Sequence, residues 1–367
     1  MKALSLSVEG FRNLEKATIL FDEKVNIIYG DNGQGKTNIL EALWLFTGSR
    51  SFRFAKDREM VGYDNDFARL ELKFDSGGRE QTAQIAIDSK RHGRLNGVEL
   101  KSMNELNGRF CAVVFSPTDL SLVKEGPQER RHFIDSAICQ VMPRYFKAVS
   151  TCMNAINQRN AILKNRDYAA YYKDMLIAWD KRLCDMSGEI YIARKRYIKK
   201  INDRAREIYK GISSGGESFE MRYVPVNSCG SETAKEFSEK YYQILRGNVD
   251  EDMRLGFTSA GVQKDDIEIL IDGHPAKNYA SQGQQRSAVL SMKLAEAELL
   301  KSITGEMPVA VLDDVMSELD VKRQDFILHH LGGWQVFITC CDPSQVLRLA
   351  GGKKIFVENG KITLPDE

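Results

Sequence analysis

Residues 25–45 constrain the fold of this 367-residue chain more than any other segment. The apolar run VNIIY leads into GDNGQGKT at residues 30–37, and the helical sequence NILEALWLF follows. These eight residues match the pattern G-x-x-x-x-G-K-[ST], in which the glycines let backbone N–H groups and a helix N-terminus face phosphate oxygens. The lysine of that pattern reaches the terminal phosphates, and the hydroxyl residue binds Mg²⁺. The segment therefore predicts a strand, a loop and a helix that hold a nucleotide through Gly30, Asp31, Asn32, Gly33, Gln34, Gly35, Lys36, Thr37 and Asn38.

A second acidic motif follows an apolar strand pattern at residues 308–314, PVAVLDD. Asp313 is suited to the coordination shell of Mg²⁺, and Asp314 is suited to positioning the attacking water. Thr37 and Asp313 are thus the expected metal ligands, and Lys36, Asp313 and Asp314 the expected catalytic residues. The run VMSELD follows the two acids, and SQGQQR opens a long helical pattern at residue 281.

Composition excludes several classes of protein. Hydrophobic residues make up 43% and charged residues 28%, which is typical of a globular chain. Glu9 and Arg12 interrupt the N-terminus where a secretory signal needs an apolar stretch, and no run approaches the ~18 apolar residues of a membrane span. Seven cysteines without C-x-x-C spacing indicate reduced thiols rather than disulfides or zinc. We expect a cytoplasmic protein.

The pattern of hydrophobic residues changes twice along the chain. Alternating segments such as LSLSVEGF and ARLELKF predict an N-terminal sheet, and helical periodicity takes over from Pro127 for some eighty residues. Strand patterns return with IEILIDG at residue 267 and VAVLDD at residue 309. The predicted fold is α/β: a sheet in residues 1–118 that resumes in residues 255–367, with an inserted, mainly α-helical domain at residues 119–254.

The middle of the chain is basic. Residues 119–210 contain 19 Lys and Arg against 11 Asp and Glu, although the whole chain has a formal net charge of only +1. Such cations can neutralise DNA phosphates without reading bases, whereas the alternative is a solvated helix face. The candidate DNA-binding residues are Arg130, Arg131, Arg194, Lys195, Arg196, Lys199 and Lys200.

The order of these motifs resembles the RecF family of bacterial recombination mediators, which are ABC-type ATPases related to SMC head domains. The similar segments are FRNL at 11–14, GDNGQGKTNILEA at 30–42, SFR at 51–53, FSPTDLSLVKEGPQERRHFID at 115–135, SQGQQR at 281–286 and LDDVMSELD at 312–320. The resemblance covers nearly the whole chain, including a helical insert that is short beside the long arms of SMC proteins.

The resemblance implies that residues 1–118 and 255–367 together form an ABC/SMC-like P-loop ATPase head. It also implies an ATP-dependent homodimer in which two heads clamp two ATP molecules with Mg²⁺. Arg12 would contact phosphates in cis, while Ser281, Gly283 and Gln284 of the partner subunit would contact the γ-phosphate. Asp320 would lie across the interface, and Ser116-Pro117 and Thr339 would stand where ABC proteins place a glutamine loop and a switch histidine. The implied role is in DNA repair, recombination, replication and the SOS response: weak, DNA-stimulated ATP hydrolysis, binding of double-stranded DNA at single-strand gaps and junctions, and loading of RecA with RecO and RecR.

Two departures from the family pattern affect these expectations. Val262-Gln263-Lys264 replaces the usual Pro-His-Arg, and Asp314 stands where most ABC enzymes have glutamate. A carboxylate shortened by one methylene should hold the attacking water less well, so we expect slow hydrolysis. Two other functions remain open at this point: an ATP-gated scaffold that contacts DNA only through partners, and a transporter ATPase subunit.

Overall fold

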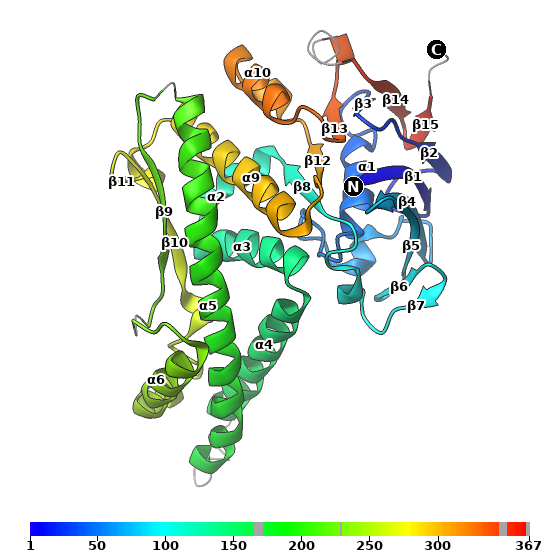
Figure 1. Cartoon of the computed structure of the whole chain (residues 1–367). Helices are drawn as coiled ribbons and strands as arrows, with labels where there is room; N and C mark the ends of the chain where they lie inside the picture. Colours follow the sequence, from blue (N-terminus) through cyan, green and yellow to red (C-terminus); the bar gives the residue numbers. More distant parts are fainter. Residues whose placement is uncertain (165–171, 214, 228–229, 345–350, 365–367) are drawn as a thin grey trace. The chain divides into compact units, whose positions relative to one another are not determined.

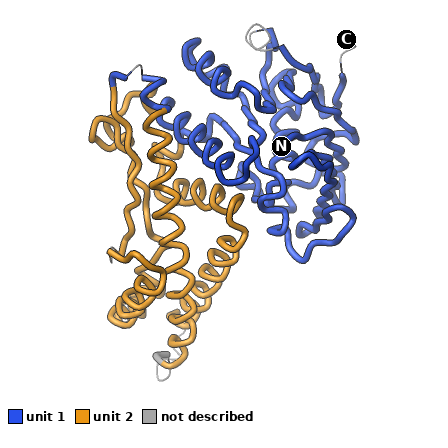
Figure 2. Tube along the Cα trace, in the orientation of Figure 1, with its two compact units in different colours: residues 1–120, 208–216, 286–367 blue, residues 121–207, 217–285 orange. Residues whose placement is uncertain are grey.

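The computed structural model describes residues 1–164, 172–213, 215–227, 230–344 and 351–364 (Figure 1). The chain divides into two compact units (Figure 2). The first unit combines both chain ends and consists of residues 1–120, 208–216 and 286–367. The second unit consists of residues 121–207 and 217–285. Residues 255–285, which the sequence pattern assigned to the ATPase head, thus belong to the second unit.

An antiparallel sheet opens the first unit, and every adjacent pair of its strands is antiparallel (Figure 1). The strands alternate between buried and more exposed side chains, as in β4, because one face covers the core and the other is open. In sheet order the strands are β2 (Ala17–Leu20), β1 (Lys2–Glu9), β4 (Ala68–Ser76), β5 (Arg79–Ile87), β6 (Arg91–Leu95) and β7 (Val98–Glu99).

A mostly parallel sheet forms the second layer of the first unit. Every residue of β8, β12 and β13 is buried, which is typical of parallel strands covered on both faces. In sheet order the strands are β15 (Lys361–Thr363), β14 (Lys353–Glu358), β3 (Val25–Tyr29), β13 (Val336–Cys340), β12 (Val309–Leu312) and β8 (Ala112–Phe115). Because β3, β13 and β12 run parallel and adjacent, the residues after β3 and β12 meet at one edge of the sheet.

The two sheets share one hydrophobic core with the helix that follows β3. Leu40 and Leu43 of this helix, Leu6 and Phe74 of the antiparallel sheet and Phe337 of the parallel sheet all belong to it. The main helices of the first unit are α1 (Lys36–Leu45), most of α9 (Gln282–Thr304) and α10 (Val321–His330).

The second unit is mainly helical, as the sequence predicted. Its helices are α2 (Ser121–Lys124), α3 (Pro127–Val141), α4 (Pro143–Lys164), most of α5 (Tyr172–Ile212), α6 (Ala234–Gly247), α7 (Val249–Leu255) and α8 (Ala276–Tyr279) (Figure 1).

A small sheet also belongs to the second unit and corrects one expectation. The strand pattern at residue 267 does form a strand, β10 (Asp266–Ile271), but this strand does not resume the sheet of the first unit. It pairs with β9 (Phe219–Val224) and β11 (His274–Pro275). Hydrophobic alternation predicted the strand but carried no information about which strand it pairs with.

Candidate nucleotide-binding site

The loop between β3 and α1 has the backbone that phosphate binding requires. Gly30 and Gly35 have φ values of 147° and 117°, which side chains rarely allow. A Cβ at Gly30 would lie 2.2 Å from the carbonyl oxygen of Val357, and one at Gly35 would lie 2.8 Å from Asn13 Oδ1. Among the described residues, no side chain caps α1, and its first turn holds no acid. The N–H of Asn38 donates to the carbonyl oxygen of Gly35 at 3.0 Å, whereas the N–H groups of Lys36 and Thr37 lie at the helix N-terminus, where an anion can bind.

Lys36 folds back over this loop. Its Nζ donates to the carbonyl oxygens of Gly30 at 2.7 Å and Asp31 at 3.0 Å, and it lies 3.8 Å from Cys341 Sγ. Cys341 Sγ in turn donates to Asn32 Oδ1 at 3.2 Å. The ammonium is thus held at the mouth of the loop, where phosphate oxygens would replace the carbonyls.

The two predicted metal ligands meet, although 276 residues separate them in the chain. Thr37 Oγ1 donates to Asp313 Oδ1 at 2.8 Å, and Thr339 Oγ1 donates to the same oxygen at 2.9 Å. Burial raises the pKa of Asp313, while both hydroxyl hydrogen bonds act in the opposite direction. Thr339, which was expected at the position of the switch histidine of ABC proteins, therefore binds the predicted metal ligand directly.

The donor set suits Mg²⁺. A hydroxyl and a carboxylate are hard oxygen ligands, and Mg²⁺ in nucleotide sites uses one or two carboxylates together with phosphates and waters. Within the described ranges there is no cluster of three or more His, Cys, Asp or Glu side chains that could hold a metal alone. Thr37 and Asp313 would therefore supply two ligands of Mg²⁺, and phosphates of the nucleotide and waters would supply the others.

Asp314 has a strained backbone, with a φ of 56°. Its N–H donates to Thr339 Oγ1 at 2.8 Å, which fixes this conformation at the end of β12. Residues held in this region of φ are concentrated at functional sites.

Arg12 lies in the site but is bound within the protein. Its Nε and Nη2 donate to the two carboxylate oxygens of Glu41 at 2.9 and 2.8 Å, and its Nη1 donates to the carbonyl oxygen of Glu59 at 2.8 Å. The carboxylate of Glu41, on α1, is completely buried and also accepts from Ser51 Oγ. In this structure Arg12 positions α1 through Glu41.

Three residues of the site were missed as site residues by the sequence analysis: Asn13, Glu41 and Arg53. Asn13 Nδ2 donates to the carbonyl oxygens of Gly33 and Gln34, and its Oδ1 accepts from Asn38. Arg53 Nη1 donates to Asn38 Oδ1 at 2.9 Å, and the positive charge of Arg53 partly opposes the burial that raises the pKa of Asp313. The family-like segments FRNL, SFR and GDNGQGKTNILEA contained Asn13, Arg53 and Glu41, but none of the three residues was assigned to the site.

The SQGQQR segment lies in the second unit up to Gln285 and begins α9. Ser281 Oγ accepts from the backbone N–H of Gln284 at 3.3 Å, and Gln284 Oε1 accepts from that of Ser281 at 2.7 Å. This reciprocal pair is a capping box.

In the first unit, Asp320 caps α10 by accepting from the N–H of Arg323, and this bond lowers the pKa of Asp320. Ser116 hydrogen bonds Thr118 through their hydroxyls at 2.9 Å.

The structure corrects the DNA-binding assignment of Arg130 and Arg194. Arg130 is 7% exposed and donates twice to the carboxylate of Asp266. Arg194 is 5% exposed and donates twice to Asp135 and once to the carbonyl oxygen of Val262. Both guanidinium groups are buried and ion-paired within the second unit, so they do not face solvent.

The remaining candidate cations differ in their surroundings. Arg131 Nη1 donates to the carbonyl oxygen of Asp265, and Lys195 Nζ donates to Glu232 at 2.6 Å. Arg196, Lys199 and Lys200 are exposed on α5, and none of them has an ion-pair partner among the described residues.

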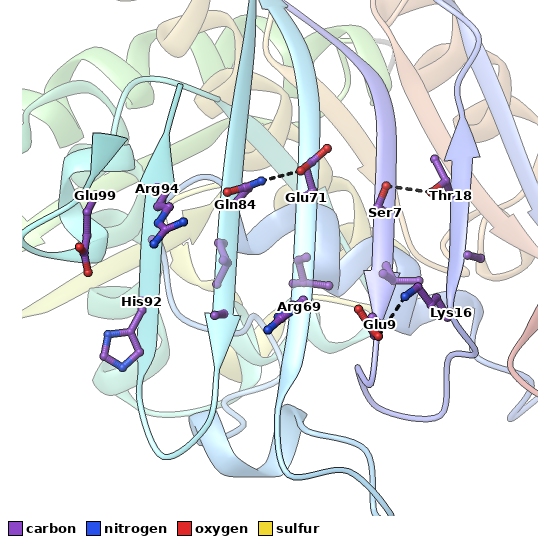
Figure 3. A pocket seen from close by; sticks show the side chains of 16 residues that line it. Ser7, Glu9, Lys16, Thr18, Arg69, Glu71, Gln84, His92, Arg94 and Glu99 are labelled. Carbon is purple, nitrogen blue, oxygen red and sulfur yellow. Dashed lines mark hydrogen bonds and ion pairs between the residues drawn. The ribbon is translucent and has the colours of Figure 1, made fainter. Parts of the chain in front are cut away.

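A hollow of about 590 Å³ lies on the open face of the antiparallel sheet (Figure 3). Its acids and bases are equal in number, and one pair is in contact, Lys16 with Glu9 at 3.1 Å. The uncharged amide of Gln84 donates a hydrogen bond to Glu71 at 2.7 Å. Arg69 lies against the ring of Phe67. The charged side chains that line the hollow are Glu9, Lys16, Arg69, Glu71, Arg94 and Glu99. Because these charges cancel, the face is not suited to a polyanion.

The chain has the fold of a P-loop ATPase head of the SMC type. Three features define this class of protein: a P-loop after β3, an aspartate pair after the nearby β12 and an adjoining antiparallel sheet. Residues 3–363 match the family described as the RecF/RecN/SMC N terminal domain. Within this class, the chain belongs to the RecF family.

Sequence relatives place it there. The chain is 38% identical over 338 residues to the DNA replication and repair protein RecF of Acetivibrio thermocellus. This alignment covers 91% of this chain and 92% of that protein. It is 36% identical over 372 residues to RecF of Clostridioides difficile, with coverage of 98% and 100%.

Solved structures agree. The recombination mediator protein RecF-ATPrS of the RecFOR pathway has a TM-score of 0.93 and 33% identity, covering 99% of this chain and 98% of that one. RecF-ATP has a TM-score of 0.92. An Smc head domain from Pyrococcus furiosus, at 16% identity and a TM-score of 0.55, shares the fold. Across the described part of the chain, no helix combines the length and apolarity needed to cross a membrane.

Proposed function

We propose that this chain is an ATP-dependent DNA-binding protein of recombinational repair, which hydrolyses ATP in the presence of Mg²⁺. The observation that carries the proposal is the 2.8 Å hydrogen bond between Thr37 and Asp313, which joins the phosphate loop to the aspartate pair. The similarity to RecF-ATP supports ATP as the nucleotide. Gly30 to Asn38, which include Lys36, would surround the phosphates, and Thr37 and Asp313 would hold the metal.

ATP would drive two copies together, with each nucleotide shared between them. The capped start of α9 supports this part of the proposal, because a helix N-terminus carries partial positive charge toward an anion. Ser281, Gly283 and Gln284 of one copy would face the γ-phosphate bound by the other, and Asp320 would lie at the same interface. Arg12 would complete the site by orienting α1.

Hydrolysis would be slow, so that ATP acts as a timed switch. Asp314, with its strained backbone, would hold the attacking water, and its side chain is one methylene shorter than glutamate. DNA would stimulate this weak activity by stabilising the dimer.

The DNA would be double-stranded and contacted near single-strand gaps and junctions, and the partners would be RecR, RecO and RecA. The similarity to a mediator of the RecFOR pathway supports these partners. Of the candidate DNA-binding residues, the exposed Arg196, Lys199 and Lys200 would neutralise phosphates.

The test is the mass of the purified protein in solution, measured with and without ATP and gapped DNA. Asp314→Asn slows hydrolysis so that the ATP state persists. We expect an ATP-dependent dimer that retains DNA. A monomer in the presence of ATP would rule out the shared-site proposal, and a dimer that ignores DNA would point to DNA contact through partners.

The DNA contact has its own matched pair of variants on α5. Lys199→Glu with Lys200→Glu should weaken DNA binding roughly tenfold or more and reduce its salt dependence. Lys181→Glu with Arg182→Glu makes the same charge change at exposed positions of the same helix and should have little effect. Equal effects of the two pairs would show only a general charge effect.

One observation favours a second candidate function, an ATP-gated scaffold whose DNA contact is made by partners. Arg130 and Arg194 are engaged in buried ion pairs, so the exposed basic surface is smaller than the sequence indicated. Binding of gapped DNA by the purified protein alone supports the first function. Binding that appears only after RecR and RecO are added supports the second.

A further inference from the structure

Phe257 is an exposed aromatic side chain in the loop that follows α7. It is 39% exposed, and Lys264 Nζ lies 4.8 Å from the centre of its ring. A lone exposed ring is common on protein surfaces and needs no explanation. Here, however, a second lysine lies beside the same loop, because a Cβ on Gly256 would lie 3.5 Å from Lys164 Cγ at the end of α4. Both lysines are exposed, so two cations accompany the ring.

The backbone on both sides of Phe257 is held in place. Gly256 caps α7 with a φ of 72°, a left-handed conformation that favours glycine. Thr258 is buried, and its N–H and hydroxyl both donate to Asn160 Oδ1 at 2.8 Å. The same hydroxyl accepts from the buried Arg159 at 2.9 Å. A fixed backbone thus presents the ring to solvent, so little conformational entropy would be lost when a ligand packs on it.

The segment at residues 262–264, which departs from the family pattern, forms the other side of this loop. The carbonyl oxygen of Val262 accepts from the buried Arg194 at 2.7 Å. Val262 itself is buried, whereas Lys264 is exposed and lies over the ring. The anchored end of this segment therefore holds the ammonium group of Lys264 at the surface beside the aromatic side chain.

The charges around this loop favour an anionic ligand. Helix α4 has four basic residues and no aspartate or glutamate among its 22 residues. Arg159 is buried and paired with Asp180 and Asp252, so it presents no charge to solvent. Residues 256–264 contain no acid either. The exposed charges of α4 and of residues 256–264 are therefore all positive: Arg144, Lys147, Lys164 and Lys264.

Phe257 lies far along the second unit from the α5 cations that we propose to contact DNA. Arg159, which binds the residue after Phe257, also donates to Asp180 of α5 at 2.7 Å (Figure 1). Lys199 follows Asp180 by 19 residues on this helix, which is about 29 Å at a rise of about 1.5 Å per residue. Double-stranded DNA spans this length in about nine base pairs, at about 3.4 Å each. The two positions are thus far enough apart to contact different parts of one DNA molecule.

We propose that Phe257 stacks on a base of single-stranded DNA, while Lys164 and Lys264 bind the neighbouring phosphates. This inference rests on the proposed binding of gapped DNA and names the residues that contact its single strand. A ring accompanied by two cations matches the alternation of base and phosphate along a strand. Every base has a π-face, and lysines that bind phosphates carry no sequence information, so the site would recognise that a strand is single and not which bases it contains.

The test compares two fluorescently labelled DNAs with the same number of phosphates by anisotropy titration in the presence of Mg·ATP. One is a blunt duplex, and the other is a duplex that continues as a single-stranded thymidine tail. Phe257→Ala should weaken binding of the tailed DNA about tenfold, the loss expected for one stacked base, and leave binding of the blunt duplex unchanged. Phe257→Tyr keeps the ring and should bind both DNAs like the parent protein.

Phe67→Ala is the matched control. Phe67 is 42% exposed and has Arg69 Cζ 4.8 Å from the centre of its ring, so this variant removes a similarly exposed ring with a similarly placed cation from the first unit. It should bind both DNAs like the parent protein. Lys264→Gln should lower the salt dependence of tailed-DNA binding by about 0.7 in logarithmic slope, the value for one phosphate contact on a single strand.

Four outcomes would overturn the inference. If Phe257→Ala binds both DNAs like the parent protein, the ring is only a surface partner of Lys264, and the proposed function stands. If it loses both DNAs equally, the ring only supports the second unit. If it binds both DNAs but no longer binds RecR or RecO, the ring contacts a protein. If the parent protein binds neither DNA, the proposed DNA binding fails and the inference fails with it.

Discussion

At the scale of single residues, the site depends on a buried carboxylate that makes no contact with the phosphate loop in this structure. Glu41 is fully buried on α1 and accepts from Arg12 and Ser51, with Arg53 Nη1 3.7 Å away. A buried charge needs all of its partners, because removing one leaves the others uncompensated. The two arginines are therefore oriented by a side chain beneath the loop.

We predict that Glu41→Ala lowers the free energy of unfolding by about 3 kcal/mol, because it leaves the partly buried Arg12 without its carboxylate. Urea unfolding measures this quantity. Glu9→Ala removes an exposed pair with Lys16 and should cost less than about 1 kcal/mol. Similar losses for the two variants would contradict a structural role for Glu41.

The cysteines allow a second prediction at this scale. Burial raises the pKa of Cys111 and Cys139 to about 12 and that of Cys152 and Cys340 to about 11, whereas Cys341 is exposed beside Lys36. Of the described cysteines, Cys341 should react fastest with a thiol reagent at pH 8, because thiolates are the reactive form. Mg·ATP should slow this reaction severalfold. Mass spectrometry of the labelled peptides identifies the site, and undiminished labelling with saturating ATP would contradict the placement.

At the scale of helices and strands, the local sequence predicted where each helix or strand lies, but it did not predict which segments pack or pair with one another. The strand, loop and helix around Lys36 were predicted because each has its own pattern. Arg194 was misassigned because its partner Asp135 lies 59 residues away, and the pattern of charges does not show pairing. A signal did exist: Arg194 lies four residues after Ile190 and three before Tyr197, on the stripe of α5 that is buried. A cation on an apolar stripe calls for a buried acid.

The helices of the second unit meet at another such cation. Arg159 of α4 donates to Asp180 of α5 at 2.7 Å and to Asp252 of α7 at 2.6 Å, and all three side chains are fully buried. Arg159→Met should lower the free energy of unfolding by about 3–5 kcal/mol, because it leaves two carboxylates without a cation. Arg254→Met, which removes an exposed pair with Glu251, is the control.

The loss should also depend on pH. Burial raises the pKa of Asp180, and Arg159 opposes this shift, so removing Arg159 raises the folded-state pKa further. A carboxyl group with a raised pKa in the folded state binds a proton on folding, and stability then falls as pH rises above the unfolded pKa. The deficit of Arg159→Met should therefore be larger at pH 7 than at pH 5 in urea unfolding. A deficit that grows toward acid pH would contradict this assignment.

At the scale of the whole molecule, the chain passes between its two units several times. Helices α5 and α9 both contain residues of both units. The sequence indicated that both chain ends form the ATPase head, yet it placed residues 255–285 there because β10 has an ordinary strand pattern. That strand pairs with β9 instead, and strand pairing depends on long-range packing that periodicity does not contain. The phosphate loop consequently belongs to one unit, and Ser281 to the other.

This division makes the shared-site proposal testable by hydrogen exchange. In the parent protein, Mg·ATP should protect residues 30–38 within each copy and residues 281–285 when a second copy closes on the nucleotide. Ser281→Arg places a bulky cation at the start of α9, so it should keep the first protection and lose the second. Lys36→Met should lose both. We expect the Ser281→Arg variant to have the mass of a monomer in the presence of ATP. If residues 281–285 of this monomer were still protected from exchange by ATP, the segment would respond to ATP bound within its own chain, and the shared-site proposal would be contradicted.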